Sequence, residues 1–135
     1  MIPIPKRQAR RERMRITSDG DIGIGTITPT TKLEVAGTIT ETSMRELKTN
    51  ITNMVNMLPS VLQMQGVQFD WKDQDGINNY GFIAEDVDKI LPNVVSHDEE
   101  GKAQGIQYTK MTAVLLEAIK EQQVQIEELK SKILN

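Results

Sequence analysis

The chain has 135 residues, of which 38% are hydrophobic, and only two Phe, two Tyr and one Trp are present. That length allows one small domain with an appendage, and so few core side chains indicate that burial depends on partner chains. The absence of cysteine excludes disulfides and thiolate metal sites, and the lone His97 has no second histidine with which to bind zinc. We therefore expect no metal and no cofactor.

The net charge of -3 combines two unlike halves, because residues 1–42 carry seven Lys and Arg against five Asp and Glu, and residues 43–135 carry nine against fourteen. Six basic residues fall between Lys6 and Arg15 without an interleaved aromatic side chain, which argues against a nucleic-acid partner and favours a basic tail over residues 1–13. No apolar run approaches the roughly 20 residues that span a bilayer, and the N-terminus lacks the apolar core of a secretion signal. We expect a soluble, non-secreted protein with no membrane partner.

Residues 14–42 contain short apolar pairs separated by Gly, Thr-Pro and Ala-Gly, a pattern typical of strands and turns. The pairs are Met14/Ile16, Ile22/Ile24 and Leu33/Val35. Strands this short cannot bury enough surface to be stable alone. This segment therefore requires stacking or neighbouring chains.

After residue 42 the apolar period becomes helical, which predicts a helix of about four turns from Ser43 to Leu58, before Pro59. Ser43 and Glu46 have the spacing of a capping box at a helix start. Lys48 follows Ser43 by five residues, and a serine near a neutral lysine can act as a nucleophile with its base. Local spacing leaves both interpretations of Ser43 open.

Residues 67–83 alternate in polarity on both sides of Asp75-Gly76, which predicts a β-hairpin with a long loop turning there. A short helix stopped by Pro92 follows within residues 84–95, then a second hairpin with a polar tip over residues 94–108, and a last helix from Tyr108. The expected fold class is α+β.

The last helix carries an apolar heptad pattern with spacings of 4, 3, 4, 3 and 4 residues, typical of a coiled coil. Isoleucine at a with leucine at d by itself favours two strands, and one d position is polar. Packing of this stripe against its own domain is the alternative. The six residues, called the seam below, are Leu115, Ile119, Gln122, Ile126, Leu129 and Ile133.

Four blocks in order carry a resemblance: "SMRELKTNI", "FDWKD", "YGFIAEDVDKILPNVV" and "YTKMTAVLLEAIKEQQVQIEELK". Residues 43–135 thereby resemble the endosialidase-type intramolecular chaperone domain found at the C-termini of phage tail fibres and tailspikes. The preceding residues 14–42 look like the end of a fibre shaft, a strand repeat of triple-β-helix type.

The resemblance implies a homotrimer that aligns three chains, lets the shaft of its own parent fibre fold, and then cuts itself away in a single event. It places a catalytic dyad on Ser43 and Lys48, the cut between Thr42 and Ser43, and the trimer interface on the seam. The precursor would assemble in the host cytoplasm, and the mature fibre would lack the released domain.

Geometry sets a condition on this dyad. Five residues along an α-helix rotate by about 140°, so Ser43 must lie in extended chain for its hydroxyl to meet Lys48. Met44 departs from the family, which usually has Asp at that position. The alternatives are an uncut trimer clamp or fibre-tip binding module, and a DNA-binding regulator that uses the basic residues.

Overall fold

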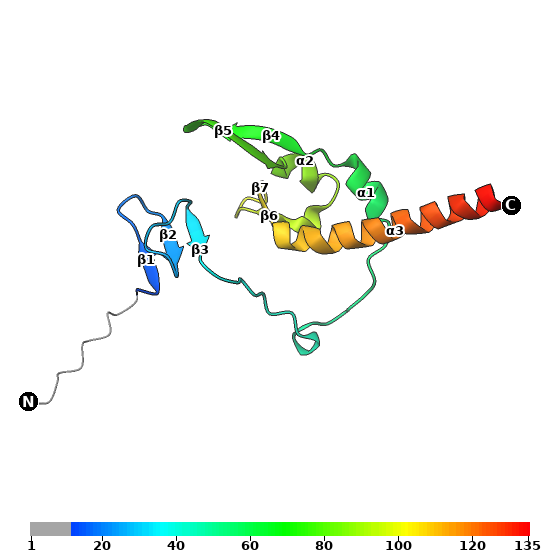
Figure 1. Cartoon of the computed structure of the whole chain (residues 1–135), viewed down its shortest axis with the longest axis horizontal. Coiled ribbons are helices and arrows are strands. Elements are labelled where there is room, and N and C mark those ends of the chain that lie inside the picture. Colours follow the sequence, from blue (N-terminus) through cyan, green and yellow to red (C-terminus); the bar gives the residue numbers. More distant parts are fainter. Residues whose placement is uncertain (1–11) are drawn as a thin grey trace, which may run out of the picture. The chain divides into compact units, whose positions relative to one another are not determined.

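The computed structural model describes residues 12–135 and leaves the side chains of Asp75 and Ile77 undescribed. The chain forms two compact units, Met1–Asn50 and Ile51–Asn135, each described below by itself. Small sheets and one long C-terminal helix make an α+β fold, as the sequence predicts (Figure 1). Most of the expected basic tail, residues 1–11, lies outside the described residues.

The first unit contains one three-stranded sheet made of β1 (Met14–Ile16), β2 (Ile22–Ile24) and β3 (Leu33–Val35). The strands lie in the order β1-β2-β3, with β1 antiparallel and β3 parallel to the central β2. The three strands coincide with the three apolar pairs of the sequence. Most of their apolar side chains are exposed in the single chain.

The four-turn helix predicted from Ser43 to Leu58 is wrong. A single 3-10 turn, η1 (Arg45–Leu47), is followed by extended chain and then by α1 (Met57–Gln63). Asn50 and Asn56 adopt left-handed backbone, with φ of 52° and 59°, which interrupts a right-handed helix. Pro59 lies in the first turn of α1, where proline is tolerated, so it does not end a helix here.

The second unit holds two hairpins, three α-helices and one 3-10 turn. The first hairpin pairs β4 (Val67–Trp71) with β5 (Gln74–Gly81), and its chain reversal lies at Lys72-Asp73. The predicted turn at Asp75-Gly76 is therefore wrong: Gly76 does have a positive φ of 75°, but it lies inside β5.

The remaining elements of this unit are those predicted, except that the short helix ends at Asp88, before Pro92, and Pro92 begins a 3-10 turn. They are α2 (Ala84–Asp88), the 3-10 turn η2 (Pro92–Val94), the hairpin of β6 (Val95–His97) and β7 (Ala103–Ile106), and α3 (Tyr108–Leu134).

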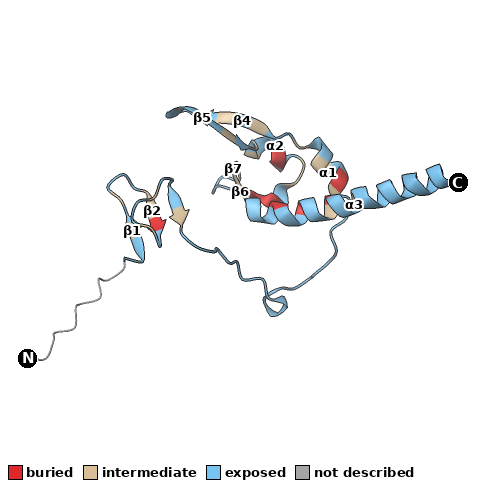
Figure 2. Ribbon diagram, viewed as in Figure 1, coloured by how far each residue is buried: buried red, intermediate tan, exposed pale blue. Residues whose placement is uncertain are grey.

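The core of the second unit forms where α2, η2 and β6 meet the first half of α3 and where α1 packs on α3. From residue 122 onward every residue of α3 is exposed (Figure 2). The buried hydrophobic side chains of the described residues are Leu58, Val87, Val94, Val95, Met111, Val114 and Ala118.

Candidate functional site

Ser43 lies outside any helix, two residues before η1, as the dyad geometry requires. Met44, between Ser43 and η1, is extended, with φ of -68° and ψ of 143°. The turn is closed by two backbone hydrogen bonds: the Leu47 N–H donates to the Met44 carbonyl at 3.2 Å, and the Lys48 N–H donates to the Arg45 carbonyl at 3.0 Å. This tight reversal brings Lys48 back to Ser43.

The Lys48 ammonium contacts Ser43 twice. Nζ donates to the hydroxyl Oγ at 2.5 Å and to the carbonyl oxygen of Ser43 at 3.1 Å. The structure thus brings together the two residues that the resemblance implies as a dyad. The predicted capping box does not form, because the residue before η1 is Met44 and no side chain caps that turn.

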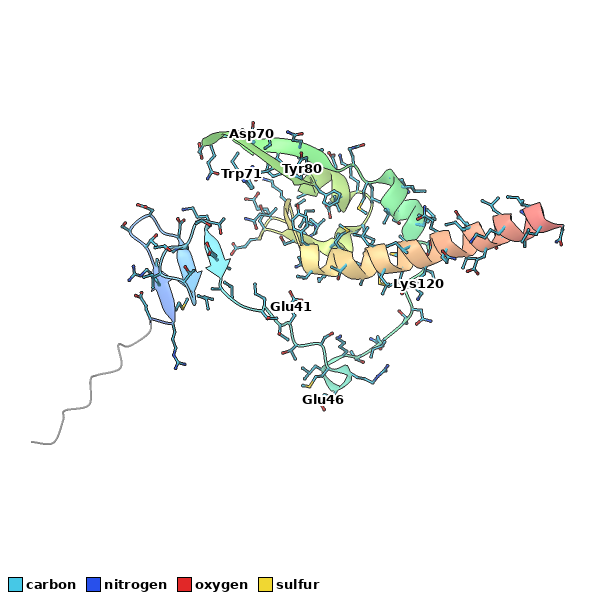
Figure 3. The ribbon with its side chains drawn as sticks, in the orientation of Figure 1. Glu41, Glu46, Asp70, Trp71, Tyr80 and Lys120 are labelled. Carbon is cyan, nitrogen blue, oxygen red and sulfur yellow. The ribbon has the colours of Figure 1, made fainter. Side chains whose placement is uncertain are left out.

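The surroundings leave Lys48 without a counter-ion. In the described part of the chain none of the ion pairs includes Lys48. Glu41 and Glu46, labelled in Figure 3, are exposed on the same segment, as are Thr42, Ser43 and Lys48 themselves. Lys48 therefore forms no ion pair with a carboxylate of the described residues, and its side chain donates hydrogen bonds to Ser43 instead.

This arrangement has the elements of nucleophilic catalysis. A hydroxyl within hydrogen-bond distance of an amine can pass its proton to that amine and attack a carbonyl carbon. The carbonyl of Thr42 is next to Ser43 in the chain. The amine must be neutral to accept a proton, and burial favours the neutral form of a lysine.

The seam of α3 is uncovered in the single chain. Leu115 is 43% exposed, Ile126 40% and Ile133 81%, and Gln122 is exposed as well. At about 100° per residue the seam is centred beside the face that buries Met111 and Ala118, although Leu129 lies on the same side of the helix as Met111. These exposed side chains give no support to packing of the seam against its own domain, and its use as a trimer interface stays a prediction.

No helix of the described residues has the length and apolarity to cross a membrane. Within the same residues, no three His, Cys, Asp or Glu side chains are grouped to hold a metal ion.

Fold and site define an α+β domain in which an exposed serine–lysine pair precedes a helix with an uncovered apolar stripe. Residues 43–96 match the model of the family Peptidase_S74, described as chaperone of endosialidase. This match over residues 43–96 confirms the resemblance seen in the sequence blocks. Comparison with curated proteins finds no match.

The match begins at Ser43 and includes three of the four sequence blocks. The fourth block, from Tyr108, lies beyond it. The catalytic role of Ser43 and Lys48 and the trimer interface on the seam are therefore proposals that rest on the geometry of this chain.

Proposed function

We propose that this chain is the C-terminal intramolecular chaperone of a phage tail fibre or tailspike, and that it cuts its own chain once between Thr42 and Ser43. The observation that carries the proposal is the 2.5 Å contact between Lys48 Nζ and Ser43 Oγ, at the first residue of the family match. The strand-rich residues 14–42 are the end of the shaft, and residues 43–135 form the chaperone domain.

The reaction has two stages. Neutral Lys48 takes the hydroxyl proton while Oγ bonds to the carbonyl carbon of Thr42, and the C–N bond to Ser43 then breaks as its nitrogen receives the proton. The amide has become an ester. A water molecule that gives a proton to Lys48 attacks the ester, and Lys48 returns that proton to Ser43 Oγ as the C–O bond breaks. A carboxyl group is left on Thr42, and Ser43 keeps its hydroxyl and gains a free amino group.

Assembly controls the timing of the cut. In the single chain Lys48 is exposed, so its ammonium form is well solvated. Coverage by neighbouring chains in a trimer removes that solvation and favours the neutral amine that accepts the proton. Cutting therefore waits until three chains have associated.

The case for association rests on uncovered apolar surface. The seam is exposed, and so are Met44, Leu47, Ile51 and Val55 on the segment around the dyad, at 51–66%. Exposed apolar side chains gathered along one helix or one segment mark an interaction site. A homotrimer that covers this apolar surface stabilises the domain. The three chains of the shaft are then aligned in register.

The test is the processing of purified variants of the full chain. Ser43→Ala and Lys48→Ala should each give trimers that stay full length, and Ser43→Cys should retain part of the cutting because a thiol is a better nucleophile. Ser18→Ala and Lys72→Ala are matched controls, since both residues are exposed and distant from Ser43 in sequence. Cutting at the wild-type rate by Ser43→Ala trimers would eliminate the serine as nucleophile.

The second candidate is an uncut trimer clamp or fibre-tip module, favoured by Met44 in place of the family's usual Asp. Met44 is 51% exposed in the extended chain directly after the serine. Met44→Asp should accelerate cutting if the methionine slows it. If neither the wild type nor Met44→Asp is cut, the clamp replaces the self-cleaving chaperone. The DNA-binding regulator stays an untested alternative: of its basic residues Arg15 pairs with Glu12 at 2.6 Å, and Lys6 to Arg11 lie outside the described residues.

A further inference from the structure

Helix α1 begins without a cap from its own segment. Asn56, the residue before it, has left-handed backbone with φ of 59°, and its side chain makes no capping hydrogen bond. The first turn of α1 contains no acidic residue. Because the first amides of any helix lack partners within the helix, α1 needs an acceptor from elsewhere.

That acceptor is Glu121 of α3. Met57 N–H donates to Glu121 Oε1 and Leu58 N–H donates to Glu121 Oε2, each at 2.9 Å. The hydrogen bonds from the Leu58 and Met57 amides hold the pKa of Glu121 below its usual value. One carboxylate therefore binds the start of α1 with both of its oxygens.

We propose that Glu121 is a positioning residue for the self-cleavage, because it ties to α3 the chain that follows the dyad. Lys48 precedes Met57 by nine residues, and residues 49–55 make no hydrogen bond to other described residues, although residues 52–55 line a groove together with α3. Glu121 thus accepts the first hydrogen bonds after the dyad that tie this chain to α3. This inference depends on the proposed function.

Glu121 is next to the proposed trimer interface. Gln122 of the seam directly follows Glu121, so α3 holds its own α1 with one face and presents the seam on the adjoining one. Association of three α3 helices would then bring together the three starts of α1 to which the dyad segments lead. Without the hydrogen bonds to Glu121, a trimer would still form, but the chain between the dyad and α1 would be less constrained.

The charged surroundings of Glu121 are simple. Residues 51–56 and α1 contain no titratable side chain. On α3, the neighbouring Glu117 and Lys120 pair with each other at 3.0 Å. Within the described residues, Glu121 is accordingly the charged group that serves the start of α1, and its replacement breaks no ion pair.

The experiment uses the full chain with Glu121→Ala, Glu121→Gln and the control Glu128→Ala. Glu128 is exposed on the same helix, and its carboxylate has no hydrogen bond or ion pair within the described residues. Cutting is timed by gel in trimers isolated by sedimentation. Amide hydrogen exchange at residues 57 and 58 is measured in the uncut Ser43→Ala background, so that it does not depend on cleavage.

Glu121→Ala should remain trimeric, exchange at residues 57 and 58 about tenfold faster or more, and cut about tenfold more slowly or more. Glu121→Gln, which keeps an acceptor without the charge, should lie between, and Glu128→Ala should match the wild type. Unchanged exchange, or wild-type cutting by Glu121→Ala trimers, overturns the positioning role and leaves the proposed function standing. A wild-type trimer that never cuts overturns the proposed function, and the positioning role with it.

Discussion

Replacement of Ile126 and Leu129 by serine should dissociate the proposed trimer. These side chains are 40% and 57% exposed in the single chain, and that exposed part is what association can bury. Full burial of such a side chain stabilises by about 1.5–3 kcal/mol, so the two sites contribute about 0.6–1.2 and 0.9–1.7 kcal/mol per chain. Over three chains the loss is about 4.5–9 kcal/mol, which weakens assembly by roughly three to six orders of magnitude.

Sedimentation equilibrium over a dilution series measures this loss directly. Leu116→Ser is the matched control, because Leu116 is 56% exposed on the same helix but does not belong to the seam. The double variant should sediment as a single chain at concentrations where the control stays trimeric, and its cutting should fall with assembly. A double variant that stays trimeric with the wild-type dissociation constant would refute the assignment of the seam.

Three further predictions concern the two units. Gly23→Ala should unfold the β1-β2-β3 sheet, because an added Cβ would lie 2.4 Å from the backbone oxygen of Thr26; loss of the sheet's amide protection checks this. Residues 14–40 expressed alone should stay unfolded or aggregate, since their short strands expose edges and apolar faces, and a soluble strand-rich fragment by circular dichroism would contradict it. The lowered pKa of Glu121 gives stability that is present above its unfolded pKa and is lost as pH falls through its folded pKa. Acid melting curves should therefore show a smaller pH dependence for Glu121→Gln than for the wild type.

The sequence predicted best where local signals decide the structure. The strands around Gly23 are framed by turn residues, so their apolar pairs mark them directly. The stripe from Leu47 to Leu58 suggested a helix, yet most of its side chains are exposed in the single chain. Apolar residues at helical spacing indicate side chains that become buried, but not the element that carries them. In the single chain these side chains are exposed, and we expect another surface to cover them. Asp75-Gly76 was predicted as the point of chain reversal, but the chain reverses at Lys72-Asp73, and Gly76, with a positive φ of 75°, lies inside β5.

The sequence predicted the contact between Ser43 and Lys48 only on the condition that Ser43 lies outside a helix. The 3-10 turn that satisfies this condition is set by two backbone hydrogen bonds that no residue pattern announces. Glu121 was missed because it and Met57 are 64 residues apart in the chain. A signal was nonetheless available: α1 begins without a side-chain cap or an acidic first turn, so an acceptor from elsewhere was required.

The central claim, a single cut before Ser43, is tested most directly by the intact mass of the wild-type chain after assembly. The account predicts two products, residues 1–42 and 43–135, whose masses together exceed that of the full chain by one water, with Ser43 as the new N-terminus. A single full-length mass in sedimenting trimers of both the wild type and Met44→Asp would contradict it.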